Sequence, residues 1–320
     1  MEEKKKFTYG KMYERKYDPF DPTLGMMHLD IVHMLDIIDN PQATKANKIK
    51  ALRLLNEVLP GRQQEANSHN AINIIRPFLM QPPNGLLLNS LCVFNTLINT
   101  ADIAKAMLPD VPRLAEILNP DNEPPIRFEA AKLLRIIAEF VGPEPPFLSG
   151  SVPSWLTTAV SSDDSDPQFL FQAYGLLSKL ANKQSIRIPL VDSSNFLKIL
   201  NNSFSNPQLC NASIILASNI AMDTSHRGKI ALINSGILPN ISECLKNNDS
   251  KIRYGALSLM ALLAVPLQGK TSIATNENLP KQIVEIENND QDEGCRKAAA
   301  GVHVIVAELP MAKEILDKYK

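Results

Sequence analysis

The chain has 320 residues, with 44% hydrophobic residues, 21% charged residues and a formal net charge of −1. That length suffices for two ordinary domains or for one elongated array of repeats. Because the charges nearly cancel, the composition argues against nucleic acid or a membrane surface as a partner. The first residues, "MEEKKKFTYG", have no apolar signal core, and no run of about 18 apolar residues occurs. We therefore expect a cytoplasmic protein.

Residues 1–25 form an N-terminal extension that does not fit the pattern of the rest of the chain. The segment "KKKFTYGKMYERKYDPF" combines six Lys and Arg residues with several aromatic residues. Aromatic and basic side chains together suit a groove on a partner protein, which makes these residues candidates for protein binding: Phe7, Tyr9, Tyr13 and Tyr17. Packing back over the first repeat is an equal alternative, and binding of single-stranded nucleic acid is a less favoured one.

Residues 26–308 repeat one pattern. The stretch "INSGILPNISECLKNNDSKIRYGALSLMALLA" contains two apolar runs separated by a polar break. Its apolar residues are spaced by three or four positions, which predicts helices rather than strands. Copies begin near Asp30, Ala71, Val111, Val152, Asn195 and Leu279, at steps of 39 to 43 residues. This period predicts an all-α, right-handed α-solenoid of about seven repeats, which residues 309–320 close as a capping helix.

The last helix of each copy supplies columns of equivalent residues. Offsets of four and seven positions place three columns on one helix face, which we expect to pack between repeats. The first column contains small residues: Ala51, Ser90, Ala130, Ala173, Ser213, Ala256 and Ala299. The second contains Leu55, Phe94, Leu134, Leu177, Ala217, Met260 and His303. The third contains Val58, Leu97, Ile137, Leu180, Ile220, Leu263 and Val306.

The best-formed copy resembles an armadillo repeat. "GILPNISECLKNNDSKIRYGALSLMALLA" has the Gly and apolar–Pro entry, the Leu-rich helix and the Ala–Leu pair of that family. "LASNIA" is similar to the family's last-helix signature, and "SHRGKIALINSG" to its short first helix, which distinguishes it from the related HEAT repeat. The resemblance implies a non-catalytic scaffold that binds proteins along its concave face.

Within this family, the chain is most similar to the small armadillo proteins of ciliary radial spokes, the radial spoke head 14 type. "YGK", "KALRLLNEVL" and "GKIALINSGILPNISECLKNNDS" carry that likeness. It implies a structural subunit of the axoneme of a cilium or flagellum, near radial spokes or doublet microtubules, with other axonemal proteins as partners. The alternative is a cytosolic or nuclear adaptor that binds a peptide or a signalling protein.

The concave face supplies further candidates for protein binding. The importin-alpha branch of the family holds basic peptides with Trp and Asn ladders, and here only Asn219 occupies its matching position. The remaining face divides into two parts. We expect the first half to be polar and somewhat basic, and to meet an acidic or hydrogen-bonding segment through Arg53, Asn56, Asn95, Lys132 and Arg135. We expect the second half to be more apolar and to pack against a helix or subunit through residues such as Ile215.

The sequence contains no complete motif for catalysis or for cofactor binding. "LQGKTS" resembles the end of a phosphate-binding loop, but the required earlier Gly is Ala264, and "HRGKIA" recurs at the same repeat position. The five histidines and four cysteines have no spacing typical of a metal site or a catalytic triad. We therefore expect no enzyme activity, no cofactor and no small-molecule substrate.

Overall fold

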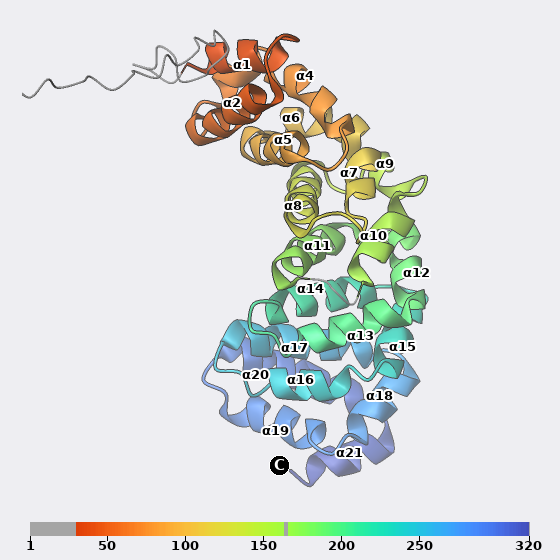
Figure 1. Ribbon diagram of the computed structural model, residues 1–320. Coiled ribbons are helices and arrows are strands. Elements are labelled where there is room, and N and C mark those ends of the chain that lie inside the picture. The colour runs from red at the N-terminus through yellow and green to blue at the C-terminus, as the bar shows by residue number, and fades with distance from the viewer. Residues whose placement is uncertain (1–29, 163–165, 320) are drawn as a thin grey trace, which may run out of the picture.

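The computed structural model describes residues 30–162 and 166–319 (Figure 1). These residues fold into helices joined by short breaks, with no strand among them. Within the same residues, no helix has the length and apolar character needed to span a membrane. The boundary predicted between the N-terminal extension and the first repeat lies outside the described part of the chain.

The third helix of each repeat packs against the third helix of the next, and Figure 1 shows this layer along the inner side of a curved molecule. The layer consists of α2 (Lys45–Val58), α5 (Gly85–Leu97), α8 (Pro124–Val141), α11 (Pro167–Leu180), α14 (Cys210–Ala221), α17 (Ser250–Leu263) and α20 (Glu293–Val306).

The other helices form the remaining layers of the solenoid. The second helices are α1 (Ile31–Asp39), α4 (Ala71–Ile75) with the 3-10 turn η1 (Arg76–Met80), α7 (Val111–Ile117), α10 (Val152–Val160), α13 (Ser194–Ser203), α16 (Leu238–Cys244) and α19 (Leu279–Asn289). The short first helices are α3 (Gln63–Ser68), α6 (Ala101–Ala106) with η2 (Leu108–Asp110), α9 (Pro145–Leu148), α12 (Gln184–Asp192), α15 (Arg227–Asn234) and α18 (Leu267–Ala274). The final helix, α21 (Pro310–Asp317), follows the last repeat and packs on α18, α19 and α20. This is the α-solenoid that the repeat period predicts.

The columns of equivalent residues form the core of this stack. Every member of the small-residue column and of the second column is buried, and Ala256 and Met260 are fully inaccessible to solvent. The third column is buried except for Val58 in the first repeat, which is half-buried. His303 is buried in the last repeat, where its Nδ1 lies 2.5 Å from Oε2 of Glu287. The register read from the sequence is therefore confirmed.

In several repeats, a basic residue of the third helix lies three positions before the small-residue column. Its side chain donates to carbonyl groups at the C-terminal end of the second helix. Lys48 donates to the carbonyl of Ile38 at 2.8 Å, and Nε of Arg127 donates to the carbonyl of Leu118 at 3.2 Å. A cation placed there satisfies carbonyl groups that a helix C-terminus leaves without a partner.

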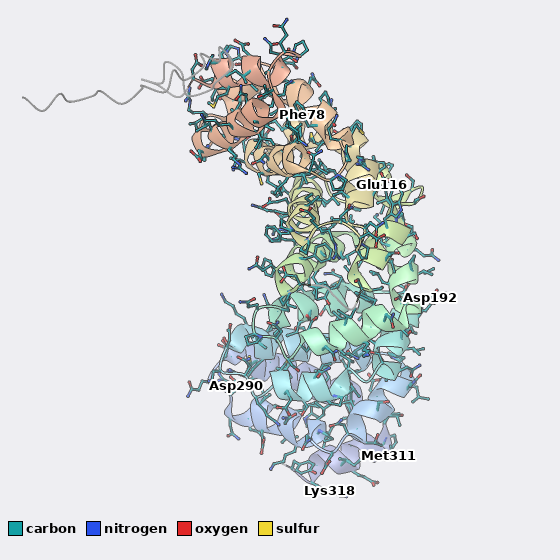
Figure 2. The ribbon with its side chains drawn as sticks, in the orientation of Figure 1. Phe78, Glu116, Asp192, Asp290, Met311 and Lys318 are labelled. Carbon is teal, nitrogen blue, oxygen red and sulfur yellow. The ribbon has the colours of Figure 1, made fainter. Side chains whose placement is uncertain are left out.

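Arg253 extends this arrangement to the next repeat. Its NH1 donates to the carbonyl of Asn247 at 2.8 Å, while Nε and NH2 each donate to a carboxylate oxygen of Asp290 at 2.7 Å. Asp290, labelled in Figure 2, lies between α19 and α20. The bonds from Arg253 hold the pKa of Asp290 below its usual range. Arg253 therefore joins two consecutive repeats and also satisfies a carbonyl group after the second helix of its own repeat.

The two Gly–Lys pairs have a packing role. Gly228 and Gly269 lie near the starts of α15 and α18, each against the end of the preceding third helix. A Cβ on Gly228 would lie 2.3 Å from the carbonyl oxygen of Ile220, and one on Gly269 would lie 1.7 Å from that of Leu263. Lys229 is buried and donates to the carbonyl of Asp223. The close crossing of α15 and α18 over the ends of the preceding third helices therefore requires these glycines, and it accounts for the Gly–Lys pairs that resemble a phosphate-binding loop.

Replacing Ala256 with Asp should bury an unpaired carboxylate between α14, α17 and α20. We expect the free energy of unfolding to fall by about 3 kcal/mol or more, because a buried charge without a partner loses its hydration. Urea denaturation followed by circular dichroism measures this loss. Ser258→Asp, on the half-buried inner side of the same helix, is the matched control and should change stability by less than about 1 kcal/mol. Equal stability of the two variants would contradict the register.

Replacing Gly269 with Ala should force α18 away from the carbonyl of Leu263. We expect a loss of about 1–3 kcal/mol, because overfilling a close-packed contact moves the backbone. Gly301→Ala is the control, since a Cβ there meets nothing within 4 Å. That change should stabilise α20 by about 0.5–1 kcal/mol, because Gly is a poor helix former. Thermal denaturation of the two variants should therefore shift in opposite directions.

Candidate protein-binding groove

A groove of about 490 Å³ crosses the inner face of the solenoid over α8, α11 and α14. These three helices lie next to one another in the middle of the inner layer (Figure 1). Its lining combines charged, amide and apolar side chains: Arg135, Glu139, Phe171, Gly175, Ser178, Lys179, Asn211, Ala212, Ile215 and Asn219. We call this feature the inner groove.

Helical spacing explains why α11 contributes to the inner groove. Phe171, Gly175 and Ser178 follow one another by four and three positions, so they share one face of the helix. The small-column residue Ala173 and its neighbour Leu177 lie on the buried face, where they pack between repeats. Burial of one face thus leaves the other exposed along the inner layer.

Gly175 leaves space for Arg135 to lie across α11. A Cβ at Gly175 would lie 2.6 Å from Cδ of Arg135, so a larger residue would displace this side chain. NH1 of Arg135 donates to Oε1 of Glu139 at 3.0 Å. Its Nε is buried and has no hydrogen-bond partner. A desolvated donor without a partner costs about 1–3 kcal/mol, so hydrogen bonds do not fully compensate the burial of this atom.

Two large apolar side chains flank the polar groups. Phe171 on α11 is 45% exposed and Ile215 on α14 is 46% exposed. Asn219, one turn after Ile215, donates its side-chain N–H to the carbonyl of Ile215 at 2.9 Å. The inner groove therefore offers apolar surface beside cationic side chains, a combination that is enriched where proteins meet.

The structure brings three of the predicted solenoid residues together in the inner groove, namely Arg135, Ile215 and Asn219. Lys132 is half-buried on α8, one turn before Arg135. Phe171 and Glu139 were missed by the sequence analysis. Phe171 lies two positions before the small column, and this offset was the signal that could have found it.

The remaining predicted residues of the first half bond to neighbouring helices. Nε of Arg53 on α2 donates to Oδ1 of Asn89 on α5 at 3.2 Å. Oδ1 of Asn56 accepts a hydrogen bond from the Thr96 hydroxyl at 2.7 Å. These bonds join α2 to α5, so much of the polar character expected for a partner is used between repeats.

Asn95 makes the corresponding connection from α5 to α8. Its side-chain N–H group donates to the carbonyl of Glu129 at 3.0 Å and to Oε2 of the same residue at 2.6 Å. The predicted aromatic residues of the extension lie outside the described residues: Phe7, Tyr9, Tyr13 and Tyr17. The inner groove is thus the part of the inner face where predicted residues and open volume coincide.

The thiol of Cys92 on α5 and the phenol of Tyr174 on α11 retain their protons at neutral pH. Burial raises the pKa of the Cys92 thiol to about 11, and burial raises the pKa of Tyr174 to about 12. A thiol that keeps its proton is a poor nucleophile. Among the described residues, no group of three or more His, Cys, Asp or Glu side chains is arranged to hold a metal ion.

Comparison with known proteins identifies the fold. No model of a known protein family matches the chain, and no curated protein matches its sequence. An engineered protein solved by crystallography is similar in structure, with a TM-score of 0.76, 16% identity, and coverage of 90% of this chain and 71% of that chain. A designed armadillo repeat protein matches with a TM-score of 0.63, 14% identity, and coverage of 73% of this chain and 100% of that chain. At these identities the likeness establishes the fold, which is an armadillo-type α-solenoid.

Proposed function

We propose that the protein is a non-catalytic scaffold that binds other proteins along the inner face of its solenoid. The observation that carries this proposal is the inner groove, where Arg135 and Lys179 lie beside the exposed side chains of Phe171 and Ile215. Exposed aromatic and aliphatic residues next to Arg are enriched where proteins meet. An extended solenoid face presents such groups over several repeats.

We infer further that the partners belong to the axoneme of a cilium or flagellum, near radial spokes or doublet microtubules. This inference rests on the likeness of "KALRLLNEVL" and "GKIALINSGILPNISECLKNNDS" to the small armadillo proteins of radial spokes. A structural subunit of that kind needs a rigid array with binding faces, and the inner groove supplies such a face.

A tagged copy expressed in ciliated cells tests the axonemal inference. We expect the protein to colocalise with the axoneme and to stay with it after the membrane is removed by detergent, because a structural subunit is held by protein contacts. Fluorescence microscopy of intact and extracted cells measures this retention. Diffuse staining that detergent removes would contradict the inference.

Reversing the charges of Arg53, Lys132 and Arg135 together tests the scaffold proposal. We expect the variant with Glu at all three positions to lose the proteins that co-purify with the tagged wild type, because the inner face becomes acidic. Quantitative mass spectrometry of the bound proteins measures the loss, and circular dichroism checks the fold. The matched control reverses three exposed lysines outside the inner layer, Lys246, Lys281 and Lys313. If the inner-face variant is folded and keeps its partners, binding along this face is wrong.

A further inference from the structure

We propose that the inner groove binds an acidic segment of a partner protein that carries a large apolar side chain next to a carboxylate. The proposal rests on the scaffold function and names the chemistry of the partner at one site. Its basis is the pairing, within one groove, of two cationic side chains, Arg135 and Lys179, with two exposed apolar side chains.

The cationic side of the groove suits a carboxylate. Arg135 donates from NH1 to Glu139, and its side chain remains 26% exposed. Lys179, exposed on α11, lines the same groove. A carboxylate of a partner at the ammonium group of Lys179 would accept a charge-assisted hydrogen bond, which is roughly twice as strong as a neutral one. The groove lining therefore has two cations and one carboxylate, and its net positive charge suits an anionic group of a partner.

The apolar side of the groove suits a neighbouring side chain of the same partner. Phe171 and Ile215 come from adjacent helices and leave nearly half of their surface in solvent. Tyr254 on α17 and Val304 on α20 are also exposed, at 51% and 69%, and lie in the inner layer. The inner helices therefore carry further exposed apolar side chains toward the C-terminal repeats, and a partner with apolar residues would bury them favourably.

Charge selects among the possible occupants. The basic extension of this chain, with six Lys and Arg residues in "KKKFTYGKMYERKYDPF", would bring further positive charge to Arg135 and Lys179. Glu139 is the one carboxylate that lines the groove, and it already accepts from Arg135. A basic segment would therefore meet repulsion, whereas an acidic segment complements the site.

Three fluorescent synthetic peptides of equal length test this assignment on the full chain. They carry Glu-Leu-Glu, Glu-Ser-Glu or Lys-Leu-Lys in the same Gly/Ser background. We expect fluorescence anisotropy to show that the Glu-Leu-Glu peptide binds about tenfold or more tightly than the other two. Added salt should weaken this binding, because screening reduces the attraction between the charges. Equal binding of the three peptides, or preference for the Lys peptide, would overturn the proposal.

Single substitutions locate the binding. Arg135→Gln and Phe171→Ser should each weaken binding of the Glu-Leu-Glu peptide about tenfold, since each removes one half of the recognition. Arg62→Gln is the matched control, because Arg62 forms a comparable ion pair with Glu65 on α3, outside the groove. Both groove side chains are partly exposed, so circular dichroism should show an unchanged fold. Unchanged binding in the folded groove variants would overturn the site.

The two proposals fail separately. If the charge-reversed scaffold loses its cellular partners while the three peptides bind alike, the scaffold stands and the acidic–apolar chemistry is wrong. If the Glu-Leu-Glu peptide binds the inner groove while the charge-reversed scaffold keeps its partners, the groove chemistry stands and the scaffold's partners bind on another face.

Discussion

The contact between consecutive third helices is the interaction on which the rest of the structure depends. A small residue at the same place in every repeat, from Ala51 to Ala299, is buried against the neighbouring helix. Small side chains allow helix axes to approach closely, and the larger second column fills the space that remains. Because each third helix buries one face against its neighbours, its opposite face forms the inner surface of the solenoid.

Polar contacts add directional connections to this packing. Arg253 closes the turn at Asn247 and also binds Asp290 in the next repeat. Gly269 gives the following helix room to cross the end of α17. A large aliphatic side chain in place of Arg253 would leave the carbonyl of Asn247 without this donor. A large aliphatic side chain in place of Gly269 would collide with the carbonyl of Leu263. Geometry therefore limits these positions more than hydrophobicity does.

The inner face is divided by how its polar groups are used. In the first repeats, Arg53 and Asn95 bond to adjacent helices and hold the layers together. In the middle repeats, Gly175 opens a space in which the side chain of Arg135 lines a groove together with Phe171. A cation that bonds between repeats contributes to the stability of the array, whereas one beside an open apolar groove is available to a partner.

The sequence by itself determined the helical class, the repeat period and the buried columns, because these follow from local spacing repeated seven times. It also located Arg135, Ile215 and Asn219 on the inner helices. Only the tertiary structure decided that Arg53 and Asn56 bond to neighbouring helices, while Phe171 joins Arg135 in a groove. Those relations depend on contacts between residues about one repeat apart, and helical periodicity within one repeat does not specify which polar groups meet across the interface.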